Sequence, residues 1–231
     1  MTRKFTVMLI CLILSSTLIA QEKAFHFGFK IAPSMSWIKP QSQNYVNEGV
    51  RLGFNWGFVG DFYLMENYSL QSGFNILYVN GAYSYPDMYQ PDGVSSPITG
   101  TTTRELRLKY VQIPAILRMR TNYFDKMAFY GEAGLALAFK TGAKADDEFQ
   151  GQILTHTLTD QDVSKQYRFS RESLVLGAGM FYKLNGSTRL FGGLRFDNNF
   201  FDIIKDQNAV DPKVKQNGIA NYIELNIGIL L

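Results

Sequence analysis

The chain has 231 residues, of which 46% are hydrophobic, 14% aromatic and 19% charged, and its formal net charge is +3. This length suits one domain or one barrel and disfavours two full domains. A mean hydropathy of −0.10 excludes a bundle of membrane helices, which needs long apolar runs, and the scattered basic residues form no patch for nucleic acid.

The first segment, residues 1–20, predicts a secretory signal peptide. Arg3 and Lys4 precede a short apolar stretch from Phe5 to Leu14, and the segment ends at the small residue Ala20 before polar residues. A basic head, a short apolar middle and a small residue at the end are typical of such peptides. The apolar stretch is also too short for a comfortable transmembrane helix.

Cleavage after residue 20 leaves residues 21–231 as a single predicted domain. The only cysteine, Cys11, lies in the removed segment. The mature chain therefore contains no thiol, which excludes disulfides and thiolate metal sites and is compatible with an oxidising compartment beyond the inner membrane.

Apolar and polar residues alternate strictly in about eight segments of the mature chain. This period of two is typical of strands that present one apolar and one polar face, and each segment has roughly the length of a tilted membrane strand. The segments are Phe25–Ala32, Arg51–Phe62, Leu70–Tyr78, Leu106–Leu117, Met127–Leu137, Leu174–Lys183, Arg189–Asp197 and Tyr222–Leu231.

The fourth segment, Leu106 to Leu117, changes phase. Its apolar residues switch parity after Tyr110, and Pro114 follows shortly afterwards. Because proline cannot donate to a strand ladder, we expect a bulge near Pro114. The pattern places Arg107 and Lys109 opposite the apolar face.

Short and long connections alternate between the predicted strands. The short turns are expected at Met65 to Asn67, Thr121 to Lys126 and Asn185-Gly186, and the long polar loops at Lys39 to Gly49, Ser84 to Thr103, Thr141 to Gln166 and Ile203 to Gly218. Short turns at one rim and long loops at the other predict an all-β fold, an eight-stranded antiparallel up-and-down transmembrane β-barrel with periplasmic termini and extracellular loops.

Residue size indicates which face points inward. The polar parity is rich in glycine, whereas the apolar parity is dense in Phe, Leu and Ile. An eight-stranded barrel has room inside only for a limited volume of side chains, so the bulky set is expected against lipid. The alternative is a soluble lipocalin-like binder, which has the opposite arrangement.

The charged residues of the polar parity are the candidate site. Both signs occur among them, which favours a structural network of ion pairs that closes the lumen; the alternative is a conducting or ligand-binding path. These residues are Lys30, Asp61, Arg107, Lys109, Glu132, Arg195, Asp197 and Glu224.

Other candidate sites are weaker. Aromatic residues near strand ends, Trp37, Tyr63, Tyr68, Tyr83, Tyr123 and Tyr182, are expected to form girdles at the membrane interfaces, with sugar stacking by Tyr83, Tyr85 and Tyr89 as an alternative. The acidic run Asp146-Asp147-Glu148 lacks the spacing of a calcium loop. His26 and His156 have no serine or acid arrangement beside them. We therefore predict no catalytic residue, no metal site and no cofactor.

The segment Leu108-Lys109-Tyr110-Val111-Gln112-Ile113-Pro114-Ala115-Ile116-Leu117 resembles the Tyr-x-x-Ile-Pro-hydrophobic strand of the PorT-type family of small outer-membrane β-barrels. The glycine-rich segments Tyr130–Gly134 and Leu176–Gly179 are similar to later strands of that family. The resemblance implies a Gram-negative outer-membrane barrel and, for the name-giving member, a link to type IX protein secretion. It supplies no catalytic residue, and Leu231 ends the chain where an aromatic residue is usual.

The sequence thus predicts a monomeric, non-enzymatic outer-membrane barrel with a structural or interaction role at the cell surface. Its expected partners are outer-membrane lipid, lipopolysaccharide, the barrel-assembly machinery and, through the resemblance, a secretion apparatus, with no nucleic acid among them. The alternative function is a small channel or a ligand-binding barrel.

Overall fold

A computed structural model describes residues 25–93, 95–184, 186–205 and 207–231. The predicted signal peptide, its cleavage site and Cys11 lie outside these residues. No helix in these ranges is long and apolar enough to cross a membrane.

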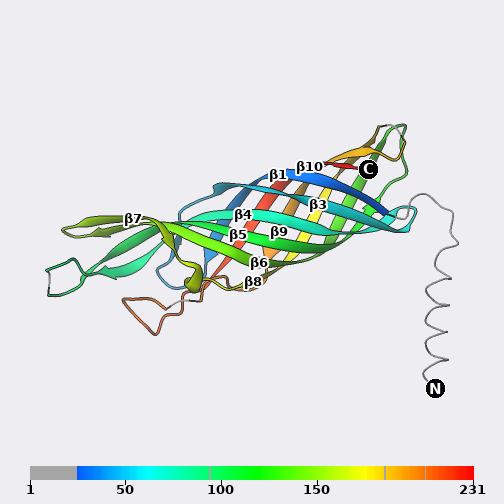
Figure 1. The fold of residues 1–231 in the computed structure, drawn as a ribbon. Coiled ribbons are helices and arrows are strands. Elements are labelled where there is room, and N and C mark those ends of the chain that lie inside the picture. Colours follow the sequence, from blue (N-terminus) through cyan, green and yellow to red (C-terminus); the bar gives the residue numbers. More distant parts are fainter. Residues whose placement is uncertain (1–24, 94, 185, 206) are drawn as a thin grey trace, which may run out of the picture.

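Within these residues, eight long antiparallel strands form a closed ring (Figure 1). Each strand pairs with its neighbours in the chain, and β1 pairs with both β3 and β10 to close the ring. The predicted eight-stranded up-and-down barrel is confirmed. Its strands are β1 (Phe25–Pro40), β3 (Arg51–Met65), β4 (Tyr68–Tyr89), β5 (Ile98–Arg120), β6 (Met127–Gly151), β8 (Ser170–Lys183), β9 (Arg189–Asn199) and β10 (Gly218–Leu230).

Three small elements complete the fold. The strand β2 (Val46–Asn47) pairs with β4, and β7 (Thr155–Asp162) extends β6 into a separate hairpin. A short 3₁₀ turn, η2 (Ser164–Gln166), leads from β7 back towards the barrel. The hairpin of β6 and β7 and the hairpin of β4 and β5 project from one end of the barrel, which we call the long-loop end (Figure 1).

The opposite end, which we call the short-turn end, carries the three short turns, the start of β1 and the C-terminus (Figure 1). The turns between β3 and β4 and between β5 and β6 fall where the sequence predicts them. In the turn between β8 and β9, Gly186 has a positive φ of 62°. A left-handed residue at a tight hairpin turn suits the twist of the two strands, and glycine adopts it without a steric penalty.

The outer face of the ring is a band of exposed apolar side chains. Phe58 is 60% exposed, Leu194 61% and Leu52 77%, while the residues between them on each strand point inward and are buried or partly buried. A continuous apolar surface of this size is typical of a lipid-facing barrel. Most phenylalanines, including Phe58, therefore face outward, as their size predicts, whereas Phe181 and Phe191 are buried inside.

The strands are longer than the apolar band requires. β4, β5 and β6 have 22, 23 and 25 residues, whereas a tilted membrane strand needs about 9–11. On β5 the outward apolar residues run only from Val111 to Met119; beyond Val111 the outward side chains are Lys109, Arg107 and Glu105. The barrel wall thus continues well past the band at the long-loop end.

Two expectations for this part of the chain were wrong. Arg107 and Lys109 lie on the outer face, and Leu106, Leu108 and Tyr110 lie inside. The strand alternates without a break past Pro114, and the irregularity in register lies at Lys109 and Tyr110 instead. The polarity of the two faces changes because the strand leaves the band, so the outside becomes polar and the inside apolar.

The polar loops expected at Ser84 to Thr103 and Thr141 to Gln166 are largely strand. Residues Ser84 to Tyr89 continue β4, Ile98 to Thr103 begin β5, and the end of β6 pairs with β7. These segments are polar because they lie outside the apolar band, and their polarity does not make them irregular.

Position along the barrel axis should decide how a charge on the outer face is tolerated. We expect Phe58→Arg to lower the free energy of unfolding by about 2–4 kcal/mol, because its outward side chain lies in the middle of the apolar band. The matched change Thr101→Arg, on the outer face of β5 beyond the band, should cost less than about 0.5 kcal/mol. Denaturant titration of the refolded protein in phospholipid vesicles measures both, and equal losses would contradict the assignment of the band to lipid.

Candidate functional site

Six charged side chains from six strands meet inside the barrel and form one chain of alternating sign, which we call the lumen ion network. Each of these residues is 5% exposed or less. The network runs Asp61, Arg118, Glu132, Arg195, Glu224, Lys30.

Glu132 is at the centre of the network. Its Oε2 lies 2.9 Å from Nη2 of Arg118, and its Oε1 accepts a hydrogen bond of 2.8 Å from Nε of Arg195. Nη1 of Arg118 reaches Oδ2 of Asp61 at 2.8 Å. One carboxylate thus joins two arginines, which would repel each other without it.

Glu224 is the second shared acid. Its Oε1 lies 3.0 Å from Nζ of Lys30 and 3.6 Å from Nη1 of Arg195. The amide of Asn55 donates to the other carboxylate oxygen at 2.7 Å, and Lys30 also donates to Asn226 at 3.0 Å. The side-chain amides therefore complete the hydrogen bonding of the Glu224 carboxylate and the Lys30 ammonium. Buried charged groups need such additional hydrogen bonds to be stable.

A separate ion pair lies nearer the long-loop end. Nη2 of Arg171 is 2.5 Å from Oδ1 of Asp197, and both side chains are fully buried. Ser173 and Gln112 each donate to Oδ2 of Asp197 at 3.1 Å. Arg171 also donates to the carbonyl of Ala220, so this pair is held from several strands.

A glycine on β8 makes room for the lumen ion network. Gly177 on β8 lies between Glu132 on β6 and Arg195 on β9 in the strand register. A Cβ at Gly177 would lie 2.6 Å from Oε1 of Glu132, closer than a non-bonded contact allows. The glycine therefore lets two residues from non-adjacent strands bond across the strand between them.

Aromatic side chains close the lumen between the network and the short-turn end. The guanidinium of Arg118 lies 4.6 Å from the ring centre of Tyr130, 5.4 Å from that of Phe181 and 5.7 Å from that of Phe191. These rings belong to a buried cluster with Val59, Ala128 and Leu230. A cation over aromatic faces is stabilised by the ring quadrupole.

An apolar plug fills the lumen towards the long-loop end. Leu77, Leu108 and other buried residues pack there around two tyrosines, Tyr83 and Tyr167, whose hydroxyls are 2.7 Å apart. Burial raises the pKa of Tyr167 to about 12, so the hydroxyl stays neutral at physiological pH. With ion pairs in the middle and apolar layers on both sides, the interior is packed with side chains along the axis.

The structure brings six of the eight candidate residues into the lumen: Lys30, Asp61, Glu132, Arg195, Asp197 and Glu224. It does not bring in Arg107 and Lys109. Arg107 pairs on the outer surface with Asp146 and Asp160, and Nζ of Lys109 lies 5.5 Å from the ring centre of Tyr78. Both are outside because their part of β5 lies beyond the apolar band.

Two arginines that form ion pairs in the membrane-spanning part of the lumen escaped the sequence interpretation. Arg118 follows Leu117 on the inward parity of β5, so the alternation itself could have identified it. Arg171 lies on the inward parity of β8 but precedes the segment that the alternation predicts as strand. A strand boundary placed too late was therefore enough to hide the partner of Asp197.

The acidic run Asp146-Asp147-Glu148 lies on the β6–β7 hairpin, where alternate residues take different partners. Asp146 accepts from Arg107 on the outside, and Asp147 pairs with Arg104 on the inside at 2.6 Å. The hydrogen bond from Arg107 lowers the pKa of Asp146 to about 2. Within the described ranges, no group of three His, Cys, Asp or Glu side chains could hold a metal ion.

The aromatic residues of the long-loop end also differ from the sequence interpretation. Tyr83 is fully buried and Tyr85 is 6% exposed, so both belong to the plug and Tyr83 is not a girdle residue. Tyr89 stacks on His156 with ring centres 4.4 Å apart. This contact joins the β4–β5 hairpin to the β6–β7 hairpin.

Removing the central acid should destabilise the barrel strongly. Glu132→Gln leaves two buried arginines beside a neutral amide, and we expect a loss of about 3–5 kcal/mol in the free energy of unfolding. The control Glu105→Gln removes an exposed acid that pairs with Arg51 on the outer surface and should cost no more than about 1 kcal/mol. Denaturant titration in vesicles tests both variants; a loss at Glu132 no larger than at Glu105 would show that the network is not needed for stability.

The chain is similar to several solved structures at low sequence identity. No curated protein sequence matches the chain. Among solved structures, Neisserial surface protein A is similar at 12% identity with a TM-score of 0.49, over 90% of this chain and 97% of the other. The attachment invasion locus protein Ail of Yersinia pestis is similar at 11% identity with a TM-score of 0.38, over 89% and 98%.

The sequence matches one protein family over most of its length. Residues 19–205 match the family described as outer membrane protein beta-barrel domain. This range begins before β1 and ends beyond β9, so it includes seven of the eight ring strands from β1 to β9. The chain belongs to the outer membrane protein beta-barrel domain family.

Proposed function

We propose that this protein is a monomeric outer-membrane barrel without enzymatic activity, and that its long-loop end is an interaction surface at the cell surface. One observation carries the proposal: the lumen is filled, while β4, β5 and β6 continue far beyond the apolar band. A wall that extends past the membrane around a closed interior presents surface to a partner and offers no passage.

The filled interior also separates this function from the alternative of a small channel. A water-filled path needs polar groups that are hydrated, whereas the charges of the lumen ion network bond to one another and the layers above and below them are apolar. Opening a path would require several buried ion pairs to separate, which is costly in a low-dielectric interior.

The long-loop end has the rigidity that favours recognition. The β4–β5 hairpin remains paired from Ala82 and Glu105 to Tyr89 and Ile98, and the stacking of Tyr89 on His156 ties it to the neighbouring hairpin. A surface that is ordered before binding loses less conformational entropy when a partner docks.

The proposal also includes the orientation of the barrel in the outer membrane and the identity of its partners. We place the short-turn end in the periplasm and the hairpins outside the cell, with lipopolysaccharide and outer-membrane lipid around the band and the barrel-assembly machinery as the insertion partner. The resemblance of Leu108 to Leu117 to the PorT-type strand supports a role in protein secretion, with a secretion apparatus as the partner.

Thiol labelling tests the orientation. The mature chain has no cysteine, so single cysteines at Ser95, in the tip of the β4–β5 hairpin, and at Ser187, in the β8–β9 turn, report on opposite ends. A membrane-impermeant maleimide should label Ser95→Cys in intact cells and should label Ser187→Cys only after the outer membrane is permeabilised. The reverse pattern would overturn the orientation.

Trimming the hairpins tests the interaction surface. Residues 88–99 and 149–156 are each replaced by Asn-Gly, which keeps the pairs Asp87–Gly100 and Glu148–Thr157 as the new hairpin ends. We expect the trimmed barrel to stay folded, shown by its heat-modifiable mobility on gels, and surface delivery of secreted proteins in the native host to fall to the level of a strain without the gene.

Two results would count against the proposal. A trimmed barrel that supports delivery as well as the full chain, in a host where loss of the gene abolishes delivery, would exclude the hairpin ends as the interaction surface. Steady conductance of the untrimmed protein in planar bilayers would favour the channel instead.

A further inference from the structure

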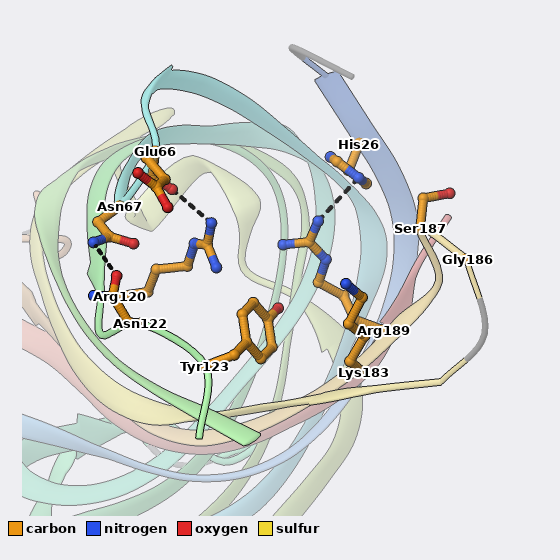
Figure 2. A pocket seen from close by; sticks show the side chains of 10 residues that line it. All are labelled: His26, Glu66, Asn67, Arg120, Asn122, Tyr123, Lys183, Gly186, Ser187 and Arg189. Atoms are coloured by element: carbon orange, nitrogen blue, oxygen red, sulfur yellow. Dashed lines mark hydrogen bonds between the residues drawn. The ribbon is translucent and has the colours of Figure 1, made fainter. Parts of the chain in front are cut away.

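A polar pocket of about 400 Å³ lies in the mouth of the barrel at the short-turn end (Figure 2). All three short turns and the start of β1 contribute to its lining. Its volume is in the range of small-molecule sites. The hairpin surface of the proposed function is at the other end of the barrel, so the inference drawn from this pocket does not rest on that function.

The pocket is strongly basic. Arg120, Lys183 and Arg189 line it, and Glu66 is the single acidic residue of its lining. Among the described residues, none of these three cations forms an ion pair with a carboxylate. This contrasts with the lumen ion network, where every charged member has an opposite charge within 3.0 Å.

In the described part of the chain, the hydrogen-bond partners of the two arginines are neutral groups. Arg120 donates from Nη2 to the backbone carbonyl of Glu66 at 2.6 Å. Arg189 donates from Nη1 to the Tyr63 hydroxyl at 2.6 Å, and its Nη2 is 3.0 Å from Nε2 of His26. These contacts fix the positions of the guanidinium groups, and among the described residues no carboxylate pairs directly with either one.

Among the residues that the structure describes, two hydrogen-bond donors of the pocket lining are still free to bind a ligand. Nε of Arg120 and the hydroxyl of Tyr123 are both buried and have no hydrogen-bond partner in the described part of the chain. In Figure 2 the guanidiniums of Arg120 and Arg189 point toward one another across the mouth, with Tyr123 between the strands that carry them. A buried donor without a partner is costly unless a ligand or water accepts from it.

Two tyrosine rings hold the three cations near one another. The ring centre of Tyr63 is 5.7 Å from the guanidinium carbon of Arg120 and 5.4 Å from that of Arg189. The ring centre of Tyr123 is 5.0 Å from the guanidinium carbon of Arg120 and 5.7 Å from Nζ of Lys183. Because all three cations also line the same pocket, an anion bound there lies near each of them.

We propose that this pocket binds a phosphate group, either a free phosphate compound or a lipid headgroup. Three cations and the carboxylate of Glu66 leave a net charge of +2 on the lining, with His26 neutral. A terminal phosphate carries a charge of about −1.5 to −2 near pH 7 and has three acceptor oxygens. Its charge matches that of the lining, and its oxygens match the donor groups of Arg120, Lys183 and Arg189. A monocarboxylate would leave part of the positive charge unpaired.

Calorimetric titration of inorganic phosphate into the folded protein tests the site, in a maltoside detergent that carries no phosphate. We expect saturable binding of one phosphate per chain, at least tenfold weaker in Lys183→Gln and in Arg120→Gln. The matched control Lys126→Gln removes a cation from the same end of the barrel that does not line the pocket, and its affinity should stay within twofold of the unmodified protein. Heat-modifiable mobility on gels shows that each variant is folded.

A second arm separates the two sources of phosphate. Binding of inorganic phosphate or glycerol phosphate in detergent supports a soluble ligand. Binding only to vesicles that contain phosphatidic acid, and not to phosphatidylcholine vesicles, with the same weakening in Lys183→Gln, supports a lipid headgroup.

Three results would overturn the proposal. The first is the absence of saturable binding to both soluble and lipid phosphate. The second is acetate binding as tightly as phosphate, and the third is Lys126→Gln weakening binding as much as Lys183→Gln, which would indicate general charge attraction.

Discussion

The narrow interior of an eight-stranded barrel constrains every other feature of this protein. Such a barrel has room for side chains but not for a hydrated channel around them, so a charge that points inward loses most of its water. Here the inward charges of the membrane-spanning part offset one another: Lys30, Arg118, Arg171 and Arg195 face Asp61, Glu132, Asp197 and Glu224. The bulky apolar residues are consequently left for the outer face, where the lipid accommodates them without packing constraints.

The outer face of the barrel wall contacts lipid within the apolar band and water beyond it. Within the apolar band the outside is apolar and the inside polar, as Ile113 and Gln112 show on β5; past the band the order is reversed, as Arg107 and Leu108 show on the same strand. The backbone alternation is continuous through this change. Whether a side chain points inward or outward therefore depends on its parity along the strand. Whether it is apolar or polar depends on its position along the barrel axis.

This difference explains how much the sequence could predict. Period-two alternation identified all eight strands because it depends on local spacing alone, and residue size gave the outward direction of most phenylalanines. The sequence interpretation failed for Arg107 and Lys109. A charged residue indicates the inner face only within the apolar band, and these two lie on the outer face beyond it. The same interpretation treated Ser84 to Tyr89 as loop, although those residues are strand. Which charges pair, such as Arg118 with Asp61, depends on contacts across the lumen that spacing does not contain.

The two ends of the barrel are chemically separate but share structural layers. Phe181 lies 5.4 Å from the guanidinium of Arg118 in the lumen ion network and 5.9 Å from that of Arg189 in the short-turn pocket. The aromatic layer thus contacts both an arginine of the lumen ion network and an arginine that lines the pocket. Because this layer and the apolar plug enclose a charge-balanced network, any coupling between the pocket and the hairpins must pass through these packed layers or along the strands.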